Sequence, residues 1–173
     1  IVDMNEVISD VSKVYKDWLR YRIKFTIELL SKPALIHADK LHVEQVILNI
    51  LINAQHAVVT KHGENNRGGE ISLVIEKAKQ EEIRSLGEGA SFLKISIKDN
   101  GVGISEELLE KVFEQNFTTR KEVGGSGFGL AVSQHIINMH KGKIEVFSKS
   151  GEGAEFQIFL PEVDSTVNLK ELH

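Results

Sequence analysis

The chain has 173 residues, enough for one domain with short appendages, and its 41% hydrophobic content allows a substantial core. A net charge of −4 provides no overall basic field, so nucleic acid is not an expected partner. Cysteine is absent, which excludes disulfides and thiol catalysis, and no apolar run approaches the roughly 20 residues of a membrane span. We therefore expect a cytoplasmic domain, whose parent protein is either soluble or tethered to a membrane.

The start of the chain predicts a helix followed by two short strands. Residues 5–20 have the spacing of an amphipathic helix, and its predicted apolar side contains Val7, Val11, Val14, Trp18 and Leu19. Residues 24–30 alternate with a period of two, which is typical of a half-buried strand. Pro33 interrupts the alternation, and residues 34–37 are a candidate second strand.

A long helix is predicted next. Asp39 is a suitable N-cap, and the helix is expected to run to about Lys61 and to end before Gly63. From residue 46 to residue 58 the sequence is apolar on almost every side, so we expect this helix to be buried.

Polar side chains interrupt this apolar helix at Asn49, Asn53 and His56, whose spacing of four and three residues places them on one face. A buried amide without a partner costs about 1–3 kcal/mol, so both asparagines require an explanation. Either they bond to nearby backbone and fix the packing, or they face a ligand cavity. In the second case an amide oxygen could bind a hard cation such as Mg²⁺, and His56 could meet a phosphate.

The rest of the chain predicts two strand pairs and a second long helix. The strands are expected at 71–75, 92–97, 144–147 and 156–160, and the helix at 130–141. The charged segment 80–90 is interpreted as a solvated hairpin loop or a small insertion. Strands in runs, without regular alternation with helices, predict an α+β sandwich with helices layered on one face of a mixed sheet. The domain is expected to span 1–161, with 162–173 as a tail.

Two glycine-rich segments flank a polar stretch in the second half of the chain. Residues 99–104 read Asp-Asn-Gly-Val-Gly-Ile after a strand, and residues 124–130 read Gly-Gly-Ser-Gly-Phe-Gly-Leu before a helix. Glycine lets a ligand approach the backbone closely, and a glycine-rich turn at a helix start offers free N–H groups to phosphate. Asp99 at the strand end could accept a hydrogen bond from a base edge. The alternative is two flexible surface loops, since neither segment matches a P-loop or Gly-x-Gly-x-x-Gly.

Four motifs follow one another at 48–54, 99–104, 112–120 and 125–130. They resemble, in order, the N box, first glycine box, phenylalanine box and second glycine box of the ATP-binding catalytic domain of two-component sensor histidine kinases, of the GHKL or Bergerat-fold superfamily. The ending at 151–161 also resembles that family. The resemblance covers nearly all of residues 2–161. It implies a Bergerat-fold two-layer sandwich, with a mixed, mainly antiparallel sheet, about three helices on one face and a flexible ATP lid at about 104–126.

The resemblance implies ATP and Mg²⁺ as ligands. By similarity, Asp99 accepts a hydrogen bond from the adenine amino group, and Asn53 ligates an Mg²⁺ ion that bridges the phosphates. The expected ATP-binding residues are Asn49, Asn53, His56, Ala57, Asp99, Gly101, Gly103, Ile104, Phe117, Thr118, Thr119, Arg120, Gly125, Ser126, Gly127, Phe128, Gly129, Leu130 and Ala154. Of these, the expected catalytic residues are Asn49, His56 and Arg120. Phe113 and Phe117 are expected to anchor the lid, and Gly101 and Gly103 to act as its hinges.

The chain departs from the family's pattern at a few positions. Gln115 and Asn116 replace a common Pro-Phe pair, and Arg120 replaces a lysine, which keeps a cation near the triphosphate. His56 stands where a lysine or another polar residue is frequent, and Ala154 where threonine is frequent.

None of the seven histidines is followed by an acidic residue within a dimerisation-helix pattern. The resemblance therefore implies that the acceptor histidine lies on a separate dimerisation domain of the parent protein, with a response-regulator receiver domain as the next partner. We expect the present chain to be monomeric with little turnover alone, and the parent to be a homodimer.

Other functions within and outside this superfamily remain as alternatives. ATPases of the gyrase, Hsp90 or MutL kind usually carry glutamate at the position of Asn49, and asparagine is a poor general base for activating water. Serine kinases of the anti-sigma-factor type usually lack the Phe-Thr-Thr block found at 117–119. A nucleotide-sensing module that binds without transferring phosphate is the third alternative.

Overall fold

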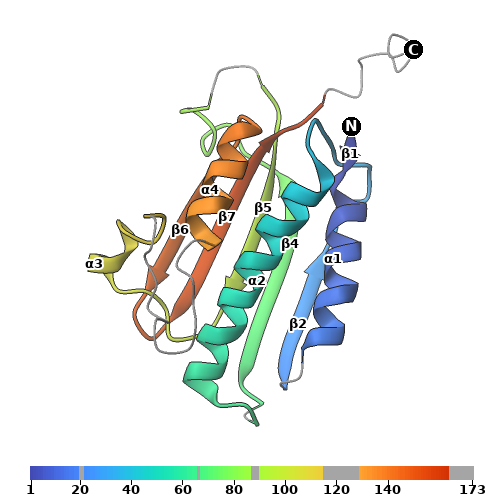
Figure 1. Cartoon of the computed structure of the whole chain (residues 1–173). Helices are drawn as coiled ribbons and strands as arrows, with labels where there is room; N and C mark the ends of the chain where they lie inside the picture. Colours follow the sequence, from blue (N-terminus) through green and yellow to red (C-terminus); the bar gives the residue numbers. More distant parts are fainter. Residues whose placement is uncertain (20–21, 66, 87–89, 115–128, 164–173) are drawn as a thin grey trace.

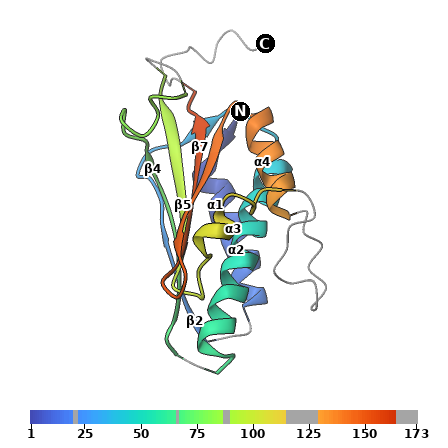
Figure 2. The same ribbon diagram turned by 90° about the vertical axis from the view of Figure 1, so that its left-hand side faces the viewer.

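The computed structural model describes residues 1–19, 22–65, 67–86, 90–114 and 129–163. They form a two-layer sandwich in which α1, α2 and α4 cover one face of a five-stranded sheet (Figure 1 and Figure 2). The elements are β1 (Val2–Asp3), α1 (Met4–Trp18), β2 (Ile23–Glu28), β3 (Leu35–Ile36), α2 (Lys40–His62), β4 (Gly69–Lys77), β5 (Phe92–Asp99), α3 (Glu106–Leu109), α4 (Gly129–Met139), β6 (Lys143–Lys149) and β7 (Gly153–Pro161). The predicted α+β sandwich is confirmed.

The sheet has the strand order β2-β4-β5-β7-β6. Its β2–β4 pair is parallel, and its other three pairs are antiparallel, so the sheet is mixed and mainly antiparallel as predicted. β1 and β3 form a separate antiparallel pair. Beyond β7, the Val163 N–H donates to the Leu35 carbonyl at 2.8 Å, which ties the chain to β3. No helix in the described ranges is long and apolar enough to cross a bilayer.

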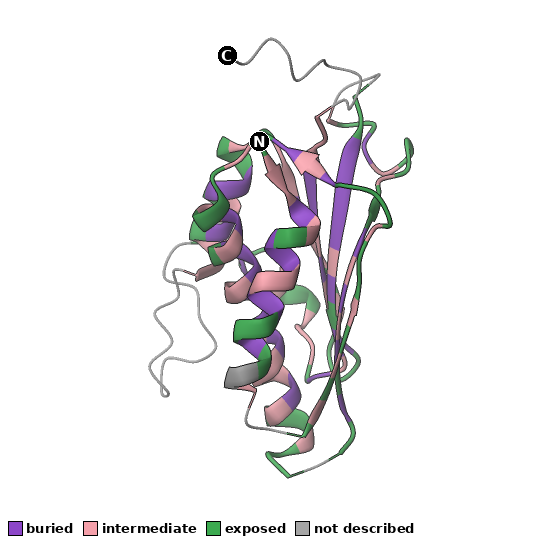
Figure 3. Ribbon diagram, turned by 90° about the vertical axis from the view of Figure 1, so that its right-hand side faces the viewer, coloured by how far each residue is buried: buried purple, intermediate pink, exposed green. Residues whose placement is uncertain are grey.

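The core lies between α2 and the sheet, with α1 and α4 on either side of α2 (Figure 1, Figure 3). The Asp39 carboxylate caps α2 by accepting from the N–H groups of Leu41 and His42, at 2.9 and 3.3 Å. The buried side of α2 consists of Val43, Val46, Ile47, Ile50, Leu51, Ala54 and Val58. Burial on almost every side was too strong an expectation, because Leu48 and Ile52 are only half-buried, although Leu48 still packs against the core.

The predicted apolar side of α1 is wrong at Val14, which is 43% exposed. The core side of α1 instead consists of Met4, Val7, Ile8, Val11 and Tyr15. With 3.6 residues per turn, this set forms one stripe, and a residue next to Tyr15 in sequence points about 100° away from it. Leu19 packs against the core as expected, and the side chain of Trp18 lies outside the described part of the structure.

The segment after β4, interpreted from the sequence as a solvated hairpin loop or a small insertion, covers part of the outer sheet face. Ile83 is 1% exposed and packs against Phe92 and Phe159, forming a second small core on the side opposite the helices. Beside it, the Lys94 ammonium is paired with the carboxylates of Glu76 and Glu82 at 2.6 and 2.7 Å. Within the charged segment, Ile83 is therefore an apolar anchor, and Glu82 beside it is held in an ion pair. Residues 87–89 lie outside the described ranges.

Replacing Ile83 with alanine is expected to lower the free energy of unfolding by about 2–4 kcal/mol, because a fully buried side chain is removed from a small core. Binding of ATP, the ligand expected from the motifs, should stay at the wild-type level, because Ile83 lies on the outer face of the sheet. Urea denaturation and calorimetry measure the two quantities. Leu41→Ala is the control, since Leu41 is 71% exposed. Equal stabilities of the two variants would show that the second core does not support the fold.

Candidate nucleotide site

One side of α2 carries three of the predicted site residues in a row. Asn49, Asn53 and Ala57 are spaced by four residues and therefore follow one another along the same side of the helix. At one end, the Asn49 Nδ2 donates to the Gly129 carbonyl and lies 3.3 Å from the Ser133 Oγ, both on α4. At the other end, the Ala57 carbonyl accepts from the Val102 N–H at 3.2 Å. Asn53 lies between these two contacts, so one continuous surface joins the start of α4 to the loop after β5.

The loop after β5 begins at a buried carboxylate. Asp99 is 5% exposed, continues the helix-facing side of β5, and pairs with Ala154 of β7 in the sheet register. Its Oδ1 accepts a hydrogen bond from the Gly101 N–H at 2.7 Å. Burial raises the pKa of Asp99, whereas the amides of Gly101 and Ala154 and the nearby Lys61 ammonium act in the opposite direction. The site therefore presents a buried acceptor that backbone N–H groups hold in a fixed orientation.

Two glycines of this loop are required by close backbone approaches. A Cβ at position 101 would lie 2.4 Å from the Ala57 carbonyl carbon, so a side chain there would push the loop away from α2. Gly103 has a φ of 68°, and a Cβ there would lie 2.1 Å from the Lys149 carbonyl oxygen. The loop is thus fixed against α2 on one side and β6 on the other.

Sequence reasoning missed two polar residues that hold this loop. The Asn100 side chain accepts from the Glu70 N–H at 2.9 Å and donates to the Gly68 carbonyl at 2.8 Å. The Ser148 hydroxyl accepts from the Ile104 N–H at 2.8 Å. A signal for Ser148 exists in the sequence, since it is the polar position in the helix-facing alternation of β6. The partners of Asn100 are distant in sequence and leave no local signal.

The structure brings together most of the described members of the predicted set. Asn49, Asn53 and Ala57 share one side of α2, Asp99 and Gly101 adjoin its end, and Ala154 lies opposite Asp99. His56 is half-buried beside this row, Ile104 is bound to β6, and Gly129 and Leu130 begin α4. The predicted residues that lie outside the described ranges are Phe117, Thr118, Thr119, Arg120, Gly125, Ser126, Gly127 and Phe128. The described start of the predicted lid contains α3, and Phe113 packs edge-on against Phe156 with ring centroids 6.4 Å apart.

Asn49 also has the packing role that was the alternative to a ligand contact. Its Nδ2 atom is committed to the contact between α2 and α4, which fixes the packing of the two helices. Ser133, which is fully buried, completes this contact by donating its hydroxyl to the Gly129 carbonyl at 2.8 Å. Only the Oδ1 of Asn49 is left to act on a ligand.

The sequence profile of the histidine kinase-, DNA gyrase B- and HSP90-like ATPases matches residues 38–164. The chain belongs to this ATPase family. Membership of an ATPase family implies that the chain binds ATP. The predicted resemblance to the ATP-binding domains of sensor histidine kinases is confirmed by the relatives of this chain.

Among the curated relatives of this ATPase domain is the signal transduction histidine-protein kinase AtoS of Escherichia coli (strain K12), 40% identical over 140 residues. Another is the sensor histidine kinase ZraS of Klebsiella oxytoca, 36% identical over 163 residues. The matches cover 81% and 92% of this chain but only 20% and 31% of AtoS and ZraS. The chain thus spans less than a third of the length of these relatives.

Solved structures with the same fold include catalytic domains of histidine kinases. The nucleotide-free catalytic domain of histidine kinase ThkA is 28% identical, with a TM-score of 0.72 and coverage of 93% of both chains. Full-length ShkA in complex with AMPPNP has a TM-score of 0.74 at 22% identity, and the match covers 95% of this chain and 31% of ShkA. At that identity the second comparison establishes the fold alone.

Proposed function

We propose that this chain binds Mg-ATP and donates the γ-phosphate to a histidine on a separate dimerisation and phosphoacceptor domain of its parent protein. The observation that carries the proposal is the row of Asn49, Asn53 and Ala57 on α2, which runs from the start of α4 to the loop after Asp99. It supports a site in which the Asn53 amide oxygen lies toward one end and the buried Asp99 carboxylate toward the other. These two acceptors suit the opposite ends of a magnesium-bound nucleotide.

Asp99 receives the adenine amino group in this proposal. The carboxylate is buried and oriented by the Gly101 N–H, so it can accept a hydrogen bond from the base where water is excluded. Guanine carries a carbonyl oxygen in place of the amino group, and that oxygen would repel the carboxylate. The buried acceptor thus selects adenine over guanine.

Asn53 supplies an amide oxygen to Mg²⁺ at the other end of the site. The described residues include no group of three or more histidine, cysteine, aspartate or glutamate side chains that could hold a metal by themselves. A single amide oxygen from Asn53 fits Mg²⁺, which usually binds through one or two protein oxygens, substrate phosphates and water. When bound, Mg²⁺ neutralises charge on the phosphates. Asn49, Asn53 and His56 orient the phosphates along the same side of α2.

Phosphate is expected to lie near the start of α4, which begins at Gly129. The N–H groups and dipole of a helix N-terminus favour an anion there. The remaining lid residues, with Gly125, Gly127 and Arg120 among them, are proposed to surround the triphosphate. Phe113, packed on Phe156, ties the start of the lid to the sheet.

Transfer needs an incoming imidazole rather than an activated water. Phosphoryl transfer depends mainly on positioning and charge stabilisation, which the site residues can supply. Asn49 donates its Nδ2 to α4 and is a poor general base, which disfavours hydrolysis of the gyrase or Hsp90 kind. The acceptor histidine and then a response-regulator receiver domain are the proposed partners, within a homodimeric parent.

A mixing experiment tests the transfer step. The chain is incubated with Mg-ATP and a separately expressed acceptor-helix domain of its own parent. The expected product is acid-labile phosphate on the acceptor domain, because phosphohistidine is hydrolysed in acid. An acceptor domain with its histidine replaced by alanine is the control. ATP binding without any phosphorylation of a well-folded acceptor would favour the nucleotide-sensing module, and acid-stable phosphate would favour a serine kinase.

A further inference from the structure

The last turn of α2 carries a lysine that lies outside the sequence motifs but reaches the Asp99 loop. The exposed Lys61 donates its ammonium to the Gly151 carbonyl at 2.8 Å, in the turn between β6 and β7. The Gly151 N–H donates to the Val102 carbonyl at 2.6 Å, and the Val102 N–H donates to the Ala57 carbonyl at 3.2 Å. These bonds join the end of α2, the loop after β5 and the β6–β7 turn into one closed ring beside Asp99.

The ring lies tightly against the backbone of Asp99 and its neighbour. Gly153 has a φ of 93°, and a Cβ there would lie 2.1 Å from the Asp99 carbonyl oxygen. The His62 Nε2 lies 3.1 Å from the Asn100 carbonyl oxygen. A displacement of the β6–β7 turn would therefore act directly on the backbone of Asp99, which lies in close contact with Gly153.

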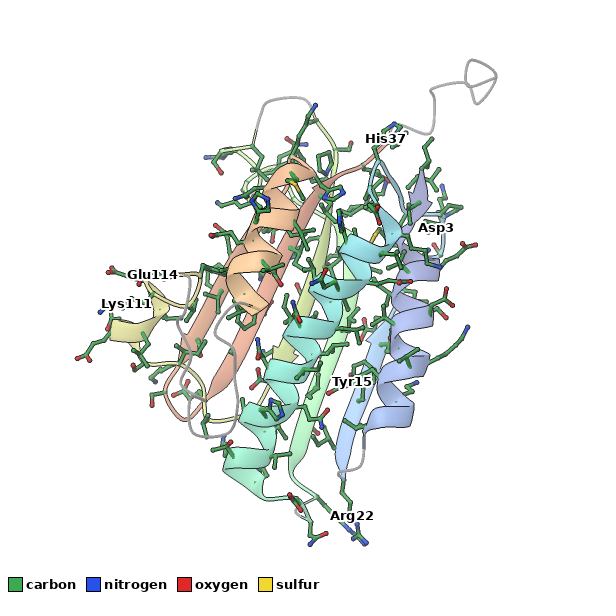
Figure 4. All side chains as sticks on the ribbon, viewed as in Figure 1. Asp3, Tyr15, Arg22, His37, Lys111 and Glu114 are labelled. Carbon is green, nitrogen blue, oxygen red and sulfur yellow. The ribbon has the colours of Figure 1, made fainter. Side chains whose placement is uncertain are left out.

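Lys61 also acts on Asp99 through its charge. Burial raises the pKa of the Asp99 carboxyl, and the Gly101 and Ala154 amides and the Lys61 ammonium lower it. Tyr15 of α1 (labelled in Figure 4) packs edge-on against Phe25 of β2, with ring centroids 5.0 Å apart. The pKa of its phenol is raised by burial and by the Asp99 charge. Lys24, Glu70, Lys98 and Glu152 also line a cavity together with Asp99. The Lys61 ammonium favours the ionised form of Asp99.

We propose that Lys61 is a positioning residue for base recognition, because its ammonium ties the β6–β7 turn to α2 and supplies positive charge to the carboxylate that receives the adenine amino group. This inference rests on the proposed adenine role of Asp99. Loss of the Lys61 charge lets the buried carboxyl take up a proton at a higher pH. A protonated carboxyl is a poorer acceptor, so the loss of ATP affinity should grow as the pH falls.

The test measures ATP dissociation constants by calorimetry, with Mg²⁺, from acidic to mildly alkaline pH. Titration of the ATP phosphates is common to all variants, so it cancels in the ratio of variant to wild type. For Lys61→Met this ratio is expected to reach about two- to fivefold at the acidic end, the scale of an exposed ionic interaction, and to shrink at high salt. Lys61→Arg should restore wild-type behaviour. Lys61→Gln, which keeps a donor for Gly151, should lose affinity only at acidic pH.

Lys98→Met is the matched control. Lys98 precedes Asp99 in β5 but is exposed on the opposite face of the sheet, so its ratio should be flat and close to one. A ratio for Lys61→Met that is independent of pH, or equal to that of Lys98→Met, would overturn the inference. Asp99→Asn, measured in the same series, separates a failure of the adenine role of Asp99 from a failure of the positioning role of Lys61. Wild-type affinity in that variant would overturn the adenine role itself, whereas its loss together with a flat Lys61→Met ratio would overturn only the role of Lys61.

Discussion

Replacing Asp99 with asparagine is expected to weaken ATP binding by about 100-fold. The change turns one acceptor of a buried, oriented carboxylate into an NH₂ group, which would face the adenine amino group donor to donor. Removal of a buried hydrogen bond to a charged group costs up to about 3 kcal/mol, which corresponds to a factor of about 100 in affinity. Calorimetry with ATP measures the loss. Asp10→Asn is the matched control, because Asp10 is an exposed carboxylate paired with Lys40 at 3.0 Å.

The same variant should remain folded. Burial raises the pKa of Asp99 above its ordinary value of 3.8, so the folded state binds the proton more tightly than the unfolded chain. Stability therefore falls as the pH rises through that window, and at neutral pH the ionised carboxylate costs stability. Asparagine removes the cost of burying an ionised group, but its neutral amide is a weaker partner than the carboxylate for the backbone N–H groups. We expect free energies of unfolding within about 1 kcal/mol of the wild type. An unfolded variant, or one that binds ATP normally, would contradict the proposed role.

Replacing Asn53 with alanine is expected to remove the Mg²⁺-dependent part of ATP binding and to slow phosphotransfer to the acceptor domain by at least about 100-fold. Mutation of residues that only hydrogen-bond to a metal ligand typically lowers metal affinity or activity about 10- to 100-fold. Asn53 is proposed as a direct ligand, so its loss should cost at least as much. Binding in the presence of a chelator should be unchanged, because the base contacts at Asp99 remain. The measurements are calorimetry with and without Mg²⁺ and the rate of acid-labile phosphorylation.

Gln55→Ala is the control for Asn53→Ala, since it removes an amide from the same helix two residues away, on a different side. An Mg²⁺ dependence that survives in Asn53→Ala, or that is lost equally in Gln55→Ala, would show that the metal is held elsewhere.

Local patterns were sufficient to predict the architecture. The alternation of β4 and β5, the Asp39 cap and the glycine after α2 are short-range signals, and each corresponds to an observed element. The polar stripe on α2 was also visible, because two asparagines in an apolar helix are costly unless they have a purpose. The structure then showed that Asn49 has a packing role as well, which the sequence had left open.

Errors arose where the decisive contact is distant in sequence. Val14 looked like a core residue because it is apolar, and only the position of the sheet decides that Tyr15 is buried beside it. Ile83 was hidden within charged residues, and its partner Phe159 lies on another strand. Lys61 meets Gly151 across 90 residues, so nothing local in the sequence indicated that contact.

The central claim is that Asn53 and Asp99 bind opposite ends of one magnesium-bound nucleotide. A crystal structure of this chain with Mg²⁺ and a non-hydrolysable ATP analogue tests it most directly. The expected structure has the adenine amino group within hydrogen-bonding distance of the Asp99 carboxylate, and the metal coordinated by the Asn53 Oδ1 and phosphate oxygens. A nucleotide whose base lies away from Asp99, or whose metal has no contact with α2, would contradict it.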